Sequence, residues 1–217
     1  MKFAMITYNT LAYQPLADIS APTKQAYCDR HGYTFVHRPM HMIQKFTGWD
    51  RMQLALDFLP EYDWVMWTGA DVIVTNPAQR IERLIDQYGI KSMAACADIF
   101  GLNSDVMLFR NCRESKEFLE ATLSPLMRGM YANAQWQEQQ VMIDLLKGAP
   151  HCFNMTWLPQ EAMNSYPYNE CAGYGRAGYI GTWYPDHFMV QLVGLDMNTR
   201  LDVARECLSR VEYYNAV

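Results

Sequence analysis

The chain has 217 residues, of which 50% are hydrophobic and 19% are charged, and its formal net charge is -5. This proportion of apolar residues is enough for a globular core and excludes a disordered chain. No cluster of basic residues stands out, which argues against a protein that holds nucleic acid mainly through its phosphates.

The first half of the sequence alternates between predicted strands and helices. Short apolar runs predict strands, apolar residues at helical spacing predict helices, and Gly32 and Pro60 are typical helix stops. In chain order we expect a strand at 2–7, a helix at 16–31, a strand at 33–37, a helix at 49–59, a buried strand at 64–67 that breaks and resumes at 72–74, a helix at 79–88, and strands at 92–95 and 106–109.

The second half is predicted to contain helices at 114–126, 137–146 and 199–213 and strands at 154–158 and 188–193. The repeated strand–helix order predicts an α/β fold with a central, mostly parallel twisted sheet and helices on both faces. The sequence shows no linker and no internal repeat, so we expect one domain. Ligands of such sheets lie beyond the C-terminal ends of the strands, and the polar residues there are the first candidates for a site.

Cysteine spacing and hydropathy indicate the compartment. The six cysteines form no C-x-x-C pair and no zinc-like spacing, so reduced thiols are expected. The apolar runs are far shorter than the ~20 residues that span a bilayer, and residues 1–6 lack the longer apolar segment of a signal peptide. We therefore expect a protein that is cytoplasmic or otherwise soluble inside the cell, with no transmembrane segment and no nucleic-acid partner.

A carboxylate follows the most apolar predicted strand. Asp71 comes shortly after the aromatic-rich run at 64–67. Carboxylate oxygens suit Mg²⁺ or Mn²⁺ bound to a diphosphate, because these cations commonly take phosphate oxygens as further ligands. Alternatively, Asp71 supports the turn that breaks the strand, helped by Gly69. The residues alone favour neither interpretation.

Several short motifs occur in the order in which one enzyme family has them. Residues 62–77 resemble the Asp-x-Asp region of nucleotide-sugar glycosyltransferases with the GT-A fold. The closer resemblance is to the galactosyl/xylosyltransferase family, which includes fungal mannan and plant xyloglucan enzymes. Further matching segments lie at 27–33, 49–51, 101–111, 138–139, 159–167 and 188–194. Their order and spacing cover nearly the whole chain.

The resemblance implies one GT-A-type, Rossmann-like domain over residues 1–217, with a nucleotide-binding half at about 1–110 and an acceptor-side half at about 111–217. It implies a retaining glycosyltransferase that moves a sugar from a nucleoside diphosphate sugar, linked to UDP or GDP, to a glycan or another hydroxyl acceptor. Mn²⁺ or Mg²⁺ is the expected cofactor. The alternatives are a catalytically weak or inactive relative that binds sugar nucleotide or glycan, and a metal-independent transferase.

The same resemblance, together with position after predicted strands, gives the candidate site. Expected donor-binding residues are Tyr8, Asn9, Arg51, Asp71, Asp98 and Asn103. Expected catalytic residues are Gln139, which matches the family's glutamine near the anomeric carbon, with Glu138 and Asp105. Without the resemblance, Glu138 and Gln139 fit an ordinary polar helix start equally well. Aromatic side chains that could stack on an acceptor or serve the core are Trp136, Tyr174, Tyr179, Trp183 and Tyr184, and residues 173–181 are expected to form an acceptor-side loop.

The expected metal site departs from the family pattern. Gly69 stands where the family has its first carboxylate, and Gln191 stands where it has a metal-binding histidine. We expect Asp71 to hold the cation and Gln191 to be a weaker second ligand, since a carbonyl oxygen suits Mn²⁺ less well than imidazole. Asp196 occupies a position where relatives tend to have a basic residue, and Asp105 replaces a glycine. The sequence therefore predicts an acidic pocket that needs a cation to hold a diphosphate.

Overall fold

The structure is a computed structural model that describes residues 1–39, 48–98, 100–149, 152–167 and 182–216. At its centre is a six-stranded sheet with the strand order β2-β1-β3-β6-β5-β7. The strands are β1 (Phe3–Asn9), β2 (Thr34–Pro39), β3 (Trp64–Thr68), β5 (Met93–Asp98), β6 (Gly101–Arg110) and β7 (Met155–Leu158). β6 runs antiparallel to β3 and β5 and the other pairings are parallel, so the predicted mostly parallel sheet is confirmed.

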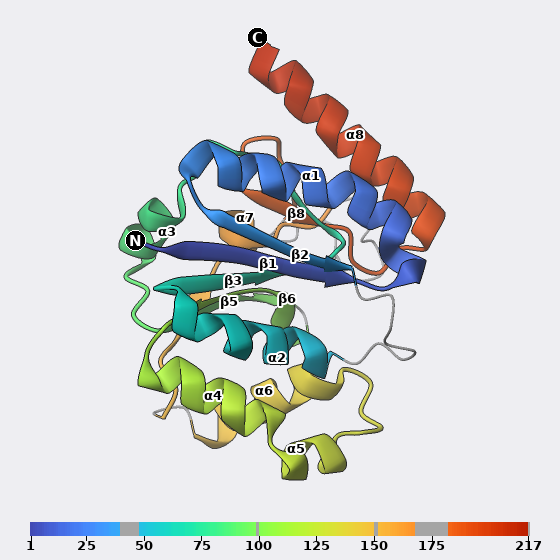
Figure 1. Ribbon diagram of the computed structural model, residues 1–217. Coiled ribbons are helices and arrows are strands. Elements are labelled where there is room, and N and C mark those ends of the chain that lie inside the picture. The colour runs from blue at the N-terminus through green and yellow to red at the C-terminus, as the bar shows by residue number, and fades with distance from the viewer. Residues whose placement is uncertain (40–47, 99, 150–151, 168–181, 217) are drawn as a thin grey trace.

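Helices cover both faces of this sheet (Figure 1). Successive side chains of a strand point to opposite faces, so Ala4 and Ile6 of β1 enter one core while Phe3 and Met5 enter the other. The first core is closed by α2 (Trp49–Phe58), α4 (Arg113–Leu123) and α6 (Gln137–Gly148), and the second by α1 (Gln14–His31), α3 (Ile81–Tyr88) and α7 (Gln160–Met163). Burial on both faces explains why β1 and β3 appear in the sequence as continuous apolar runs.

A second sheet of two strands joins the C-terminal segment to the end of β3. β4 (Val72–Val74) pairs antiparallel with β8 (Met189–Gln191), and Val72 lies opposite Gln191. The last helix, α8 (Met197–Ala216), packs beside α1, where Val203 shares an apolar cluster with Leu16. Figure 1 shows α8 and β8 on the same side of the main sheet as α1. This arrangement brings residues near 190 and 200 beside the turn that follows β3.

The observed elements differ from the predicted ones in several places. Residues 72–74 do not rejoin the main sheet, because β4 pairs with β8. The predicted helix at 114–126 is two helices, α4 and α5 (Pro125–Met130), because Pro125 cannot continue a helix and the Ser124 side chain caps the new one. The short helix α7 was not predicted, nor were the 3₁₀ turns η1 (Leu11–Tyr13) and η2 (Leu59–Glu61). The predicted helix stop at Gly32 is confirmed, with a left-handed φ of 69°.

Within the described ranges, no helix combines the length and the apolar character needed to cross a bilayer. The longest helix there, α8, carries polar and charged side chains among its apolar ones.

Candidate active site

Two cavities adjoin each other at the sheet. The β1 cavity lies beyond the C-terminal ends of β1 and β3, and the α6 cavity lies between the end of β5, the first residues of β6 and the start of α6. The β1 cavity has a volume of about 420 Å³ and the α6 cavity a volume of about 410 Å³. Both are lined by Arg51, Asp105 and Val193, so they meet at these residues. Other polar residues that line them include Tyr8, Asn9, Tyr13, Asp71 and Arg200 in the β1 cavity, and Asp98, Asn103, Gln135, Glu138 and Gln139 in the α6 cavity.

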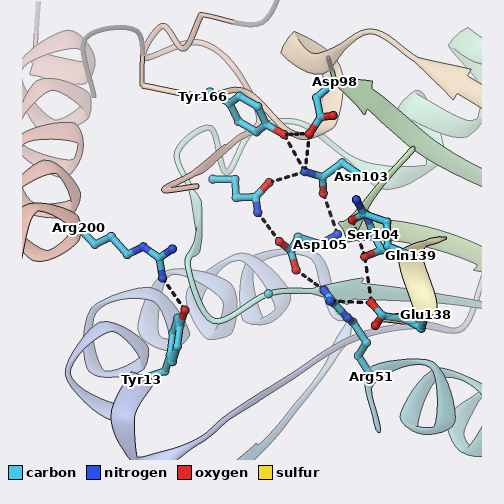
Figure 2. A network of polar contacts seen from close by, with 12 residues as sticks. Tyr13, Arg51, Asp98, Asn103, Ser104, Asp105, Glu138, Gln139, Tyr166 and Arg200 are labelled. Carbon is cyan, nitrogen blue, oxygen red and sulfur yellow. Dashed lines mark hydrogen bonds and ion pairs between the residues drawn. The ribbon is translucent and has the colours of Figure 1, made fainter. Parts of the chain in front are cut away.

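A largely buried arginine, with 12% of its side chain exposed, connects two carboxylates where the cavities meet. Arg51, in the first turn of α2, forms ion pairs with Asp105 of β6 and with Glu138 of α6, the latter at 2.6 Å (Figure 2). The Glu138 side chain is only 2% exposed, whereas that of Asp105 is 30% exposed. Burial raises the pKa of Glu138, and Arg51 opposes that rise. The charge of Arg51 is therefore already matched by two acidic partners.

The start of α6 is held against β6 by polar contacts. The Ser104 hydroxyl lies 3.2 Å from Glu138 Oε1 and 3.0 Å from Gln139 Oε1, and the Ser104 backbone N–H donates to Gln139 Oε1 at 3.1 Å. A Cβ atom at Gly48 would overlap the Glu138 carboxylate. A glycine at this position thus leaves the space that the Glu138 side chain fills.

A chain of hydrogen bonds runs from Asp105 across the α6 cavity (Figure 2). The Gln191 amide donates to Asp105, and Gln191 Oε1 accepts from Asn103 Nδ2 at 3.1 Å. Asn103 Nδ2 also lies 2.7 Å from Tyr166 Oη, which donates to Asp98 Oδ2 at 2.8 Å. Both polar ends of the fully buried Gln191 side chain are therefore engaged.

Asp71 lies beside a second buried cation. Burial, and next the Asp105 carboxylate, raise the pKa of Asp71 to about 6, although Arg200 and Lys24 oppose the rise. Lys24 of α1 is fully buried and donates to the Gly69 carbonyl at 2.6 Å, and burial lowers its pKa to about 7. The negative charges of Asp71 and Asp105 are thus only partly neutralised by the cationic side chains near them.

Two carboxylates lie beside Gly69. A Cβ atom at Gly69 would lie 2.7 Å from Asp71 Oδ1 and 3.4 Å from Asp105 Oδ1. The Asp105 carboxylate from β6 thus occupies space beside a position where the family motif has an acidic side chain. In the part of the chain that the structure describes, no group of three or more His, Cys, Asp or Glu side chains could hold a metal ion alone. A cation held by Asp71 and Asp105 would need further oxygen ligands from a bound molecule.

On the opposite side of the β1 cavity from Arg51, α8 contributes a further arginine. Arg200 donates to the Tyr13 hydroxyl at 2.7 Å, and its guanidinium lies 5.3 Å from the centre of the Tyr13 ring (Figure 2). Asp196, one turn earlier, starts α8 by accepting hydrogen bonds from the backbone N–H groups of Asn198 and Thr199 at 3.0 and 3.2 Å. These contacts fix the helix and the arginine at the cavity.

Comparison with known proteins identifies the family. The model of the galactosyl transferase GMA12/MNN10 family matches residues 5–93 and 90–201, which is most of the chain. The chain belongs to this glycosyltransferase family. A probable glycosyltransferase 3 from Oryza sativa subsp. indica is 29% identical over 108 residues, which cover 44% of this chain and 23% of the relative. The chain thus spans about a quarter of the length of the rice relative.

Two further relatives are named for the sugars that they transfer. A probable xyloglucan 6-xylosyltransferase 3 from Arabidopsis thaliana is 29% identical over 47% of this chain and 25% of its own length. An uncharacterized alpha-1,2-galactosyltransferase from Schizosaccharomyces pombe is 19% identical, over 93% of this chain and 68% of its own length. The expected resemblance to the galactosyl/xylosyltransferase family is thereby confirmed.

Solved structures confirm the GT-A fold. A glycosyltransferase involved in the glycosylation of the major capsid of PBCV-1 has a TM-score of 0.71 at 14% identity, over 95% of this chain and all of that one. The galactosyltransferase LgtC, solved with donor and acceptor sugar analogs, has a TM-score of 0.58 at 15% identity, over 95% of each chain. At these identities the likeness concerns the fold alone.

The structure gathers the predicted site residues of this family member at one place. The nine predicted donor-binding and catalytic residues all line one or both cavities, and Gln191 is joined to them through Asp105 and Asn103. Their individual roles stay predictions. Tyr174, Tyr179 and the expected loop at 173–181 lie outside the described residues.

One expectation from the sequence was wrong. Asp196 does not line the pocket: it is exposed, and its carboxylate caps α8. Of the two alternatives for Trp183, acceptor stacking or the core, the structure favours the core, because the side chain is buried and its indole N–H donates to Thr75 Oγ1 at 3.1 Å. Trp136, by contrast, lines the α6 cavity and packs against Phe100 at 4.9 Å between ring centres.

Sequence reasoning missed Lys24, Tyr13 and Arg200. Lys24 and Tyr13 precede any recognisable motif, and nothing in their surroundings marked them. Arg200 carried a weak signal, because it stands one helical turn after Asp196 in a helix that the sequence predicted.

Proposed function

We propose that this chain is a retaining glycosyltransferase that takes a hexose or pentose from a nucleoside diphosphate sugar, linked to UDP or GDP, and transfers it to a glycan or another hydroxyl acceptor. The observation that carries the proposal is the meeting of the two cavities at Arg51 and Asp105. The β1 cavity offers aromatic rings and the Asn9 amide, which suit a nucleoside, and the α6 cavity offers amides and carboxylates, which suit sugar hydroxyls. Membership of the glycosyltransferase family supports the same assignment.

In this proposal Tyr8 and Asn9 hold the nucleoside, and Asp98 and Asn103 bind hydroxyls of the donor sugar. The anomeric carbon would then lie near Gln139, whose oxygen is positioned by Ser104. As the glycosidic bond breaks, positive charge develops on the sugar, and an oriented amide oxygen stabilises it without a covalent bond.

The pairing of the nearby carboxylates supports the retaining course. Asp105 and Glu138 are ion-paired with Arg51, and Asp98 accepts hydrogen bonds from Tyr166 and from the backbone N–H of Phe100. An inverting enzyme needs a carboxylate or similar base to take the acceptor proton. Each of these three carboxylates is already engaged, which favours a mechanism in which the departing phosphate takes that proton.

We also propose that Mn²⁺ or Mg²⁺ binds with the donor, with Asp71 as its ligand and Asp105 beside it. The fit rests on the donor set, because two carboxylates crowd together beside Gly69 and hard divalent cations prefer carboxylate oxygens. Such a cation supplies positive charge to the leaving diphosphate. Gln191 can act as the predicted second ligand only after it gives up the hydrogen bond from Asn103, so this site is weaker than one with imidazole.

The test is a binding and turnover screen on the purified chain. UDP, GDP and their sugars should raise the melting temperature, and at least one sugar nucleotide should be hydrolysed or transferred with Mn²⁺ present. Gln139→Ala should lower kcat on the order of 100-fold with little effect on binding. Gln140→Ala is the matched control, because Gln140 lies on the same helix and bonds to Asp144.

The screen distinguishes the proposed enzyme from its alternatives. Binding without turnover of any donor would contradict the proposal and support an inactive sugar-nucleotide-binding relative. Full turnover with chelator and in Asp71→Asn would support the metal-independent transferase. Absence of binding to any nucleoside diphosphate would overturn the proposed donor class.

A further inference from the structure

The β1 cavity needs positive charge if it is to hold a diphosphate. Asp71 and Asp105 both line it, and their mutual repulsion contributes to the raised pKa of Asp71. Two phosphate groups placed beside these carboxylates would add further negative charge in a partly buried space, where Coulomb forces are strong. The fixed cations near the cavity therefore decide how the donor is held.

Three described cations lie close enough to act, and two of them are engaged. Arg51 is ion-paired with Asp105 and Glu138. Lys24 is buried beneath the turn, bonded to the Gly69 carbonyl, and lies outside the residues that line the cavity. Neither presents an unmatched charge to a ligand in this cavity.

Arg200 is the third cation, and it differs from the other two. It lines the β1 cavity, forms no ion pair with any described carboxylate within 4.0 Å, and bonds through one terminal nitrogen to Tyr13. Its Nε atom is buried and has no hydrogen-bond partner. Burial opposes its charge, but Asp71 and Tyr13 hold the pKa of Arg200 above its usual value. A buried donor with no partner is costly unless a ligand completes it.

We propose that Arg200 binds the diphosphate of the donor and stabilises the nucleoside diphosphate as it leaves. This inference rests on the proposed function. It assigns the basic group of the site to α8, one turn after Asp196. Asp196 itself caps the start of the helix and does not line the pocket. The rigid, planar guanidinium suits phosphate oxygens better than an ammonium does.

The bond changes define what Arg200 does. The bond between the anomeric carbon and the β-phosphate oxygen breaks, and its electron pair stays on that oxygen. The acceptor oxygen forms the new bond to the anomeric carbon, and its proton passes to the departing phosphate. Arg200 donates hydrogen bonds to the phosphate oxygens as their charge grows and exchanges no proton, because guanidinium stays protonated in proteins.

The experiment compares diphosphates with nucleosides. The affinities of the wild type, Arg200→Gln and Arg200→Lys for UDP, GDP, uridine and guanosine are measured by calorimetry, with Mn²⁺ and with EDTA. Arg205→Gln is the control, since Arg205 lies on the same helix, is 64% exposed and pairs only with Asp202 among the described ion pairs. Far-ultraviolet circular dichroism verifies that each variant folds.

We expect Arg200→Gln to bind the preferred diphosphate about 10- to 100-fold more weakly, with and without metal, and to leave binding of its nucleoside unchanged. Arg200→Lys should fall between the two, and Arg205→Gln should match the wild type. Unchanged diphosphate affinity in Arg200→Gln, an equal loss for the nucleoside, or a loss seen only with Mn²⁺ would overturn the inference while leaving the proposed function standing. A wild type that binds neither diphosphate would overturn both.

Discussion

Arg51→Met should destabilise the protein strongly, because Arg51 is the counter-charge of a buried carboxylate. The Glu138 side chain is 2% exposed and pairs with Arg51 at 2.6 Å. Removing one partner of a buried ion pair costs about 3–5 kcal/mol of unfolding free energy. The contact with Asp105 adds less, since that side chain is 30% exposed and solvent can replace part of the interaction. For a chain of this size the loss corresponds to a fall of about 6–20 °C in melting temperature.

The pH dependence gives the sharper test of this explanation. Burial already raises the pKa of Glu138 above its usual value of 4.5, and loss of Arg51 would raise it further. A carboxyl group whose pKa is higher in the folded than in the unfolded state lowers the unfolding free energy at pH values where it is ionised. This loss disappears as the pH falls and the group becomes protonated in both states. The deficit of Arg51→Met relative to the wild type should therefore be largest near pH 8 and shrink toward pH 5.

The assay is urea unfolding followed by tryptophan fluorescence at both pH values. Arg51→Met, Glu138→Gln and the double variant form a cycle, and Arg205→Met is the exposed control. The double variant should lose less than the sum of the single losses, because each single change leaves the other partner buried alone. Equal deficits at both pH values, or losses that simply add, would refute the reasoning.

Three further predictions concern the glycines and the buried lysine. Gly48→Ala should lower the unfolding free energy by about 1–3 kcal/mol, because its Cβ would overlap the Glu138 carboxylate. Gly129→Ala is the control, since the space around its Cβ is open. Equal melting temperatures for the two variants would contradict the prediction. Gly69→Asp should also lower the unfolding free energy by about 1–3 kcal/mol, since its Cβ would lie 2.7 Å from Asp71 Oδ1. In urea unfolding, the double variant Gly69→Asp/Asp105→Gly should recover part of this loss. A double variant no more stable than Gly69→Asp would contradict the explanation that crowded carboxylates cause the loss. The pKa of Lys24 falls from 10.5 to about 7 in the fold, so the unfolded chain binds more protons between these values and stability should rise with pH there. Lys24→Met should remove that rise, and an unchanged pH profile would show that Lys24 does not cause it.

Much of the fold could be predicted because its signals are local. The apolar run of β1, the helical spacing of α1 and the stop at Gly32 each depend on residues near in sequence. The rule that ligands lie at the C-terminal ends of parallel strands then predicts Tyr8, Asn9 and Asp71 at the site.

The rest depends on contacts between distant segments. Apolar periodicity does not give strand direction, so the antiparallel course of β6 and the pairing of β4 with β8 could not be predicted. The motif resemblance predicted that Asp196 lies in the pocket. Motifs matched by their order in the sequence do not show that an aspartate at a helix start accepts hydrogen bonds from the first backbone N–H groups, as Asp196 does. Arg200 was missed for the same reason, since its place follows from the packing of α8 on α1.

The pairing of β4 with β8 has a consequence for cooperativity. The β1 cavity is bounded by strand ends from the first part of the chain and by Val193 and Arg200 from the last part. A molecule bound there touches both parts, so its binding free energy also opposes local detachment of the C-terminal segment from the sheet. Amide hydrogen exchange should then slow in β8 and α8 on nucleotide binding, while β7 at the far edge of the sheet changes little. The attachment of α8 to the rest of the fold would then be stabilised both by its packing on α1 and by the bound ligand.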